Sequence, residues 1–274
     1  MVEKMISKKE FLLDSIIKAY IEHLTPIGSG QLKSMYGISF SPATIRGYFK
    51  KLGEEGYLAQ EHASSGRTPT TEALKEYWSN RLSDLNSQQY VVDYENLNIF
   101  ARKIGLTVFL KEQQTQVLHR VLNIENLYLL LEFSSFSITI KYNSALEKFL
   151  NGMCELEASA ILEVAKQVGA TELYKELDKY LFNKDFEIVN IKEFLRLCVD
   201  YNLDESDINK FLNGNIMDKI TSGLYFDNND SLGDILPHNY MGIAHDVKIG
   251  QKQCKMLVVG ELSKDYEYFY KRII

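Results

Sequence analysis

The first 80 residues alternate between stretches of helically spaced apolar positions and short breaks. Apolar residues between Phe11 and Tyr20 predict a helix that ends near His23, because the following Pro26 disfavours helix in the residue before it. A second, shorter helix is predicted to end at Gly37, since glycine readily takes the left-handed conformation that ends many helices. Two helices joined by a short turn that contains glycine are typical of helix-turn-helix proteins.

A third helix is predicted to begin after Ser41, which can cap it, with Pro42 at the first helical position. One side carries an apolar stripe, and the opposite side carries small residues and cations without an acid. A helix that enters a DNA groove needs small residues for close approach and cations for phosphates and guanine edges. An ordinary amphipathic helix with a solvated basic face would show the same pattern. The stripe is Ile45, Tyr48, Phe49 and Leu52, and the opposite face is Ala43, Arg46, Gly47, Lys50 and Lys51.

A short hairpin is predicted after this helix. Gly56 ends the helix, residues 57–60 form a strand, and residues 63–67 form a turn with Arg67 at its tip. Such a wing would place its tip on the DNA backbone or in the minor groove, where the negative potential attracts arginine. The alternative is a solvated arginine without a DNA contact. The wing completes the sequence pattern of a winged helix-turn-helix domain over residues 1–82.

The remainder predicts an α+β architecture. A fourth helix with Trp78 on its apolar stripe leads out of the first domain, and the polar residues 83–95 suggest a linker. Strand patterns near both ends of residues 96–274 suggest one mixed α/β sheet, with a helical insert at about 145–215. One insert helix has its predicted stripe at Leu156, Ala160, Val164 and Val168, and the strands are predicted at 107–110, 117–122, 127–133, 136–141, 240–248 and 255–260.

Composition and charge fit an intracellular regulator. The 274 residues have a formal net charge of −6, but residues 1–80 hold ten Lys/Arg against nine Asp/Glu, whereas the rest hold 21 against 28. The acidic remainder would keep the body of the protein away from DNA. Three widely spaced cysteines argue against a disulfide framework and indicate reduced thiols in the cytoplasm. Nothing resembles a signal peptide or a membrane span.

The motifs of enzymes and cofactor sites are missing from the sequence. It contains no Walker motif, no complete dinucleotide loop, no His-Glu-x-x-His and no Gly-x-Ser-x-Gly. His238 and the His245-Asp246 pair are the only candidates for a metal site, and we interpret them as surface-loop and strand-edge residues. We therefore expect no catalytic residues, no cofactor and no metal.

Three segments carry a resemblance to a known family. Ser41-Pro-Ala-Thr-Ile-Arg46, the run from Leu52 to Leu58, and Ser65-Gly-Arg-Thr-Pro-Thr70 resemble the N-terminal domain of the HrcA heat-inducible transcription repressors. The resemblance is specific because these segments follow one another in order across a whole domain. Two departures stand out. Gly47 replaces the usual asparagine, and the segment from Gly260 to Tyr266 keeps only the Gly and the Asp-Tyr of the family's Gly-Pro-Thr-Arg-Met-Asp-Tyr.

The resemblance implies a fold and a function. The second half would be a GAF-like domain with an inserted dimerisation domain, and the protein would be a homodimer that represses chaperone genes from an inverted-repeat DNA operator. The GroEL chaperonin would modulate it. Two alternatives remain: a winged-helix regulator controlled by a small ligand in the C-terminal domain, and an enzyme with an appended DNA-binding domain. The residues expected to contact DNA are Ser41, Ala43, Thr44, Arg46, Gly47, Lys50, Lys51, Ser65 and Arg67, with Thr44 and Arg46 nearest the base edges.

Overall fold

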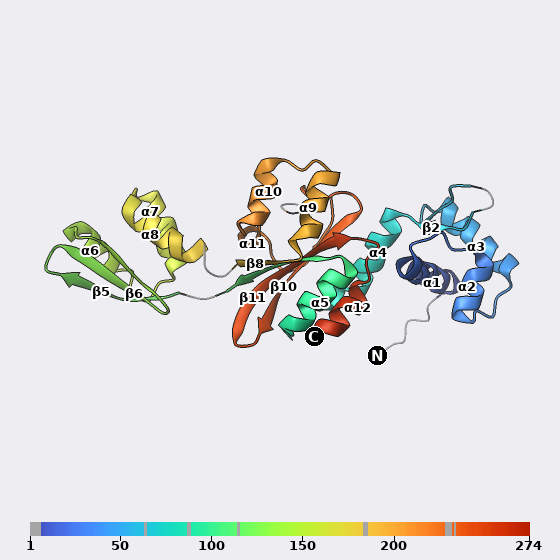
Figure 1. Ribbon diagram of the computed structural model, residues 1–274, viewed down its shortest axis with the longest axis horizontal. Helices are drawn as coiled ribbons and strands as arrows, with labels where there is room; N and C mark the ends of the chain where they lie inside the picture. The colour runs from blue at the N-terminus through green and yellow to red at the C-terminus, as the bar shows by residue number, and fades with distance from the viewer. Residues whose placement is uncertain are drawn as a thin grey trace.

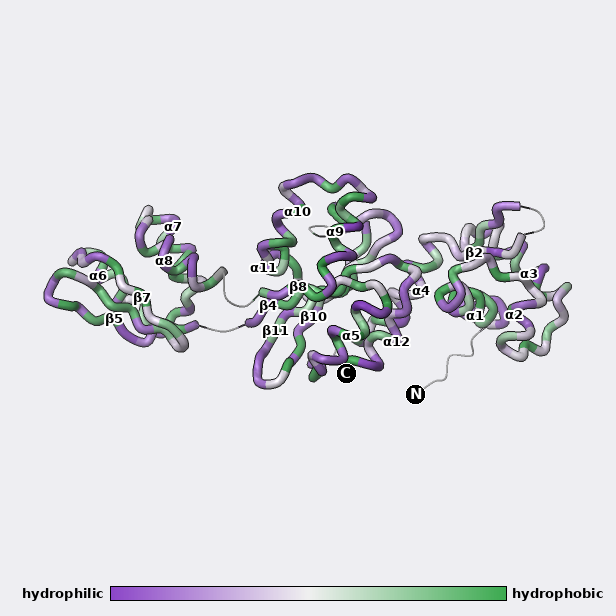
Figure 2. Tube along the Cα trace, in the orientation of Figure 1, coloured by the Kyte–Doolittle hydropathy of each residue, from purple (hydrophilic) through white to green (hydrophobic). Residues whose placement is uncertain are grey.

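The protein is an elongated α+β molecule whose three units lie in a row (Figure 1). The computed structural model describes residues 7–62, 65–86, 89–113, 116–182, 186–227, 232 and 234–274. Figure 2 shows hydrophobic and hydrophilic stretches alternating along the helices, as expected for elements with one buried face. Among the described helices, none is both long and apolar enough to cross a membrane.

The N-terminal unit contains the three predicted helices and a short hairpin. Ser41 caps the third helix by accepting a hydrogen bond from the backbone N–H of Thr44, and Gly37 ends the second helix at φ +59°. The helices enclose a core of aliphatic residues and Phe49. The elements are α1 (Lys8–His23), α2 (Ser29–Tyr36), α3 (Pro42–Glu54), β1 (Leu58–Ala59) and β2 (Thr68–Pro69).

Helix α4 (Thr71–Arg81) joins the N-terminal unit to the central unit. Its apolar side is buried in the core of the central unit, where the indole of Trp78 packs edge-on against Tyr266. Polar contacts reach both units, so α4 is a packed element rather than a free connection. The indole N–H of Trp78 donates to the Leu262 carbonyl (2.8 Å), and the Arg81 guanidinium binds both Asp14 of α1 (2.7 Å) and Glu267 of the C-terminal helix α12 (Tyr266–Ile273; 2.9 Å).

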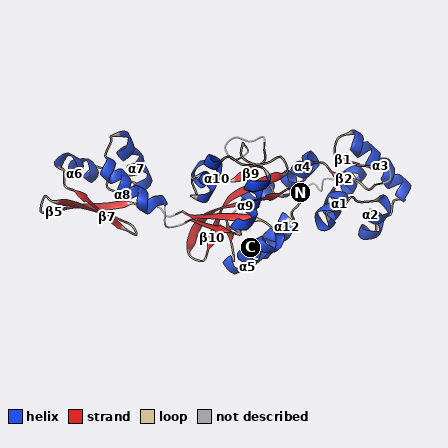
Figure 3. Ribbon diagram, turned by 45° about the horizontal axis from the view of Figure 1, so that its top comes forward, coloured by secondary structure: helices blue, strands red, loops and turns tan. Residues whose placement is uncertain are grey.

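The central unit is a six-stranded sheet with helices on both faces (Figure 3). Its strand order is β3-β10-β11-β4-β8, and β9 pairs with the first half of β10. Helices α4, α5 and α12 cover one face, and α9, α10 and α11 cover the other. The strands are β3 (Tyr90–Val91), β4 (Thr107–Glu112), β8 (Phe186–Val189), β9 (Gly223–Tyr225), β10 (Tyr240–Ile249) and β11 (Lys252–Glu261); the helices are α5 (Tyr94–Ile104), α9 (Ile191–Asp200), α10 (Glu205–Leu212), α11 (Ile216–Lys219) and α12 (Tyr266–Ile273).

The third unit is inserted between β4 and β8, two strands that pair with each other in the central sheet. It has its own core between a three-stranded antiparallel sheet and three helices. No helix of the described residues covers the other face of this sheet (Figure 1). The elements are β5 (Leu118–Ile124), β6 (Tyr128–Phe133), β7 (Ser137–Lys141), α6 (Ser144–Asn151), α7 (Ala158–Gln167) and α8 (Thr171–Phe182).

This insert corrects two expectations. The strands of residues 96–274 do not form one mixed sheet, because β5, β6 and β7 pair only with one another in the described chain. A wholly helical insert at 145–215 is also wrong: the inserted unit begins with strands, β8 interrupts the helices, and α9 to α11 pack on the central sheet. The predicted stripe of α7 was misplaced as well, since Leu156 and Val168 are exposed whereas Ile161 and Leu162 are buried.

The segment expected to be a linker is ordered for most of its length. Residues 83–86 form a 3-10 helix, and β3 pairs in parallel with β10 through Tyr90 and Val91. Asp93 then caps α5 by accepting the backbone N–H of Asn96. The expected free linker at 83–95 is therefore wrong outside residues 87 and 88, which lie outside the described ranges. Ser83, Asp84, Gln89 and Asp93 are exposed, while the backbone of Tyr90 and Val91 extends the central sheet.

The residues that the chain retains from the family's C-terminal segment have structural roles. A Cβ at Gly260 would lie 2.4 Å from the side chain of Leu106 and 2.9 Å from the Tyr266 hydroxyl, so only glycine fits. Asp265 caps α12 by accepting the backbone N–H of Tyr268. Tyr266 is fully buried, and its hydroxyl donates to the Glu261 carbonyl. These residues position the end of β11 against α4.

Candidate nucleic-acid interface

Helix α3 presents one face to the core and the other to solvent. Ile45, Phe49 and Leu52 are buried, which fixes the helix against α1 and α2. Because these residues recur at helical spacing, the residues between them must project outward. Every predicted contact residue of this helix is exposed: Ser41, Ala43, Thr44, Arg46, Gly47, Lys50 and Lys51.

The exposed face of α3 is basic and has few internal charge partners. In the described ranges neither Arg46 nor Lys51 forms an ion pair, although the Lys51 ammonium lies 6.0 Å from the ring centroid of Tyr48. Lys50 lies 3.9 Å from Glu54 on the next turn, a weak exposed pair. The hydroxyls of Ser41 and Thr44 are 2.9 Å apart at the start of the helix. An anion could therefore reach these cations without displacing strong internal contacts.

The hairpin after α3 is anchored to the turn between α1 and α2. The backbones of Arg67 and Ile27 exchange two hydrogen bonds of 2.8 and 2.9 Å. Arg67 therefore does not stand at the hairpin tip, as we expected, but at the start of the returning arm, directly before β2. The hydroxyl of Ser65 donates to the His62 carbonyl at 2.7 Å and closes the described side of the turn. Residues 63 and 64, which the prediction also placed in the turn, lie outside the described residues.

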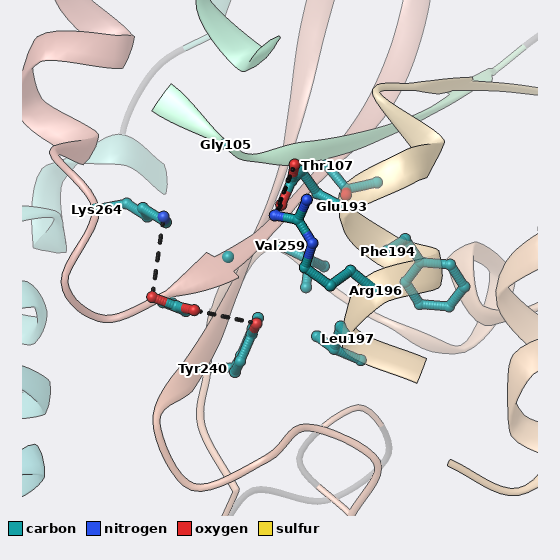
Figure 4. A pocket seen from close by; sticks show the side chains of 11 residues that line it. Gly105, Thr107, Glu193, Phe194, Arg196, Leu197, Tyr240, Val259 and Lys264 are labelled. Carbon is teal, nitrogen blue, oxygen red and sulfur yellow. Dashed lines mark hydrogen bonds and ion pairs between the residues drawn. The ribbon is translucent and has the colours of Figure 1, made fainter. Parts of the chain in front are cut away.

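The central unit contains a small cavity where β4, β11 and α9 meet (Figure 4). Its charged groups are already paired: Arg196 with Glu193 at 3.0 Å, and Lys264 with Glu261 at 3.9 Å. Its volume is about 60 Å³, the space of a few water molecules, whereas small-molecule sites are several times larger. The cavity does not suit a metabolite. Burial raises the pKa of Tyr240 on its wall, so this phenol is neutral.

The histidines considered for a metal site have different surroundings and do not share a common partner. His245 lies in the middle of β10 with 1% of its surface exposed, so its interpretation as a surface residue was wrong. Its Nε2 is 3.0 Å from the Tyr270 hydroxyl. His238 instead contacts Asp227 near α4. Across the described residues, no group of three or more histidine, cysteine or acidic side chains could hold a metal ion.

Comparison with known proteins decides the family. The family model described as the HrcA C-terminal domain matches residues 78–274, which is most of the chain. The chain belongs to the HrcA family. The heat-inducible transcription repressor HrcA of Helicobacter pylori strain 26695 is 29% identical over 98% of this chain and 95% of its own length. The HrcA repressor of Mesomycoplasma hyopneumoniae strain 7448 is 32% identical over 38% of this chain and 36% of its own length.

A solved structure supports the overall fold. A crystal structure of a hypothetical protein has a TM-score of 0.53 and 18% identity, and the match covers 98% of this chain and 95% of the other. At this identity the likeness concerns the fold alone. The HrcA relatives are transcription repressors rather than enzymes, which confirms the expectation of a non-enzymatic regulator.

The departure at Gly47 leads to a stability prediction for this HrcA protein. A Cβ at Gly47 would meet nothing within 4 Å, and Gly47 lies inside α3 on its exposed face. Glycine within a helix is less favourable than alanine by about 1 kcal/mol. We therefore expect Gly47→Ala to raise the free energy of unfolding of the N-terminal unit by about that amount, measured by denaturant titration. An unchanged or lowered value would show that Gly47 is needed for another reason.

Proposed function

We propose that the protein is a dimeric transcriptional repressor of heat-shock genes that binds an inverted-repeat operator. Residues 7–82 would act as a winged helix-turn-helix, and the central unit would be a GAF-like domain carrying an inserted dimerisation unit. The repressor would act in the cytoplasm, with GroEL as a modulator. Family membership supports the repressor function, and the basic exposed face of α3 supports a direct DNA contact.

The exposed face of α3 is the observation that carries the DNA proposal. Thr44 and Arg46 would face base edges in the major groove, because they lie in the first turns of the helix. Lys50, Lys51 and Arg67 would bind phosphates or the minor groove. Ser41 would donate its hydroxyl hydrogen to a phosphate. Ser65, whose hydroxyl hydrogen is bonded to the His62 carbonyl, would approach the DNA from the turn, while Ala43 and Gly47 would allow close approach. The backbone pairing of Arg67 with Ile27 would hold the wing next to the helix-turn-helix.

The open sheet face of the insert supports dimerisation. Ile124 pairs with Tyr128 and Leu122 with Leu130, so these four side chains share the face that lacks helices. Ile124 and Tyr128 are 44% and 48% exposed. An exposed apolar patch of this kind commonly marks a protein interface. A second copy packed on it would form a two-fold dimer, which suits two inverted half-sites.

The experiment that tests the function is binding to the chaperone-promoter inverted repeat against a scrambled duplex at fixed salt, with and without GroEL. Preference for the repeat, increased by the chaperonin, would support the repressor and its control together. Preference without a response to GroEL would retain the DNA contact and remove the modulator. Equal affinity for both duplexes would refute a sequence-specific repressor.

Arg46→Ala and Lys50→Ala separate base recognition from phosphate binding. We expect Arg46→Ala to lose roughly 1–3 kcal/mol of operator binding and to relax sequence preference. Lys50→Ala should weaken binding to all sequences alike and reduce the salt dependence. Both side chains are exposed, so both variants should fold. An Arg46→Ala variant that weakens repeat and scrambled DNA equally would assign Arg46 to the phosphates instead.

Tyr128→Lys tests the dimer. Tyr128 begins β6 and lies on the open face between Ile124 of β5 and Lys141 of β7. A lysine there would place a charge in the apolar patch of each copy, so we expect the mass measured by analytical ultracentrifugation to fall to that of one chain. Val168→Lys is the matched control, because Val168 is 59% exposed just after α7 in the same unit. A dimer that survives Tyr128→Lys would move the interface to another surface.

The cavity shown in Figure 4 does not support the small-ligand alternative in the C-terminal domain. The cavity between β4, β11 and α9 is too small for a metabolite, and its ion pairs are internal. We therefore do not propose it.

A further inference from the structure

A groove lies between α1 and α4, where the N-terminal unit meets the central unit. Its volume is about 470 Å³, within the range of small-molecule sites. Its apolar lining includes Phe11, Leu13 and Ile17 of α1 and Ala73 and Tyr77 of α4. The ring of Phe11 is 43% exposed, which is unusual for a phenylalanine within a folded unit. The groove thus offers an apolar surface that the fold leaves open to a ligand.

The charged side chains that line the groove are mostly acidic. Glu10, Asp14 and Glu76 line it together with one cation, Arg81. Asp14 is also paired with Lys18 at 3.1 Å, so the remaining negative charge of the groove comes from Glu10 and Glu76. Arg81 already contacts two carboxylates, Asp14 at 2.7 Å and Glu267 at 2.9 Å, so it has little positive charge left for an anion. Among the residues that the structure describes, Glu76 forms no ion pair, although its carboxylate accepts a hydrogen bond from the Tyr57 hydroxyl. The field in the groove therefore favours a cation and opposes an anion.

Aromatic rings add a second feature that favours cations. Tyr77 already has the Arg81 guanidinium 5.1 Å from its ring centroid, so this part of the groove accommodates a planar cation over a ring. The exposed ring of Phe11 offers another such surface. Aromatic faces close to carboxylates are the arrangement that recognises organic ammonium groups. The apolar lining would hold the hydrocarbon part of the same molecule.

We infer that the groove between α1 and α4 binds a small amphipathic organic cation. Its hydrocarbon part would lie on Leu13, Ile17 and Ala73, and its positive group would lie between the Phe11 ring and the Glu76 carboxylate. This site differs from the DNA-contacting face of α3 and from the cavity in the central unit. A ligand there would contact α1 and α4 together, so it would act on the angle between the DNA-binding unit and the body.

A pair of ions with the same shape and opposite charge tests the inference. Tetraphenylphosphonium and tetraphenylborate are titrated separately into the full-length protein by calorimetry, without DNA. Trp78, the single tryptophan of the chain, packs edge-on against Tyr77 at 4.9 Å and supplies a local fluorescence readout. We expect the cation to bind at least about tenfold more tightly than the anion and to change the Trp78 emission. The result does not depend on operator binding, so it stands or falls separately from the proposed function.

Three variants locate the binding. Asn80→Tyr fills the rim of the groove from an exposed position on α4, and we expect it to weaken cation binding by about tenfold. Glu76→Gln keeps the shape and removes the charge, and should weaken the cation by about threefold. Glu95→Gln, an exposed position on α5 outside the groove, should change nothing.

Three results would overturn the inference. The first is equal affinity for the two ions, and the second is cation binding that Asn80→Tyr leaves unchanged. The third is dissociation of a dimer by Asn80→Tyr in analytical ultracentrifugation, which would mean that a second copy of the chain covers the groove.

Discussion

Replacing Gly66 with alanine is expected to detach the hairpin from the N-terminal unit and abolish operator binding. An added Cβ would lie 2.6 Å from the carbonyl carbon of Pro26 and 2.7 Å from the backbone of Ile27. Because these are backbone atoms of the turn between α1 and α2, they cannot move aside as a flexible side chain would. The clash would break the two hydrogen bonds between Ile27 and Arg67. Overpacking of this kind costs about 3 kcal/mol.

The prediction is measured by thermal unfolding, by hydrogen exchange at the Ile27 and Arg67 amides, and by operator binding. Gly30→Ala is the matched control, because Gly30 lies in neighbouring α2 and a Cβ there would meet nothing within 4 Å. The control should retain binding and be at least as stable as the wild type, because alanine is more favourable than glycine within a helix. If Gly66→Ala retained amide protection at Ile27, the hairpin would not depend on this close approach, and the wing geometry argued above would be wrong.

Acidification is expected to lower the free energy of unfolding through His245. Burial lowers the pKa of His245 to about 4, below the ordinary value of 6.5. Between these values the unfolded chain binds a proton that the folded chain does not, so stability falls as the pH drops. The stabilising effect is complete above about pH 6.5 and is lost by about pH 4, a change of about 3 kcal/mol. Burial of the imidazole ring lowers this pKa, and Nδ1 has no hydrogen-bond partner among the described residues.

The test compares the slope of stability against pH in the wild type and in His245→Gln. Glutamine does not titrate, and its amide can still bond the Tyr270 hydroxyl that now contacts Nε2. We expect the free energy of unfolding of the variant to fall less steeply between pH 6.5 and 4 than that of the wild type, because only the wild type has His245 to protonate on unfolding. The acidic residues contribute equally to both proteins. His62→Gln, an exposed position in the hairpin, is the control and should keep the wild-type slope. Equal slopes for wild type and His245→Gln would show that His245 is accessible to protons in the folded state.

The N-terminal unit could be predicted closely from sequence because its signals are local. Ser41, Pro42 and Gly37 act within one turn of the helix that they begin or end, and the stripe through Ile45, Phe49 and Leu52 needs only helical spacing. Because helical spacing identifies the buried residues of α3, it also identifies the residues between them that must be exposed. All the predicted contact residues on this helix are exposed for that reason. Their contact with DNA stays a prediction.

Expectations failed where long-range pairing decides the outcome. Arg67 was expected at the hairpin tip, but its backbone pairs with Ile27, some forty residues earlier in the chain. The polar segment around Tyr90 resembled a linker, yet it adds a strand to β10 near the C-terminus. His245 was interpreted as a surface-loop or strand-edge residue, but β10 is central and is covered by α12.

The sequence by itself determined the helices of the N-terminal unit, the basic face of α3 and the family resemblance, since each depends on residues within a few turns of one another. Only the tertiary structure decided how residues 96–274 divide into a central sheet unit and an inserted unit. In the insert, β6 and β7 alternate buried and exposed residues, whereas β4, β10 and β11 of the central sheet carry continuous buried runs because helices cover both faces; neither pattern specifies a partner strand. The groove between α1 and α4 is likewise a product of tertiary packing, because α4 is held by Trp78 and Leu262, which are 184 residues apart.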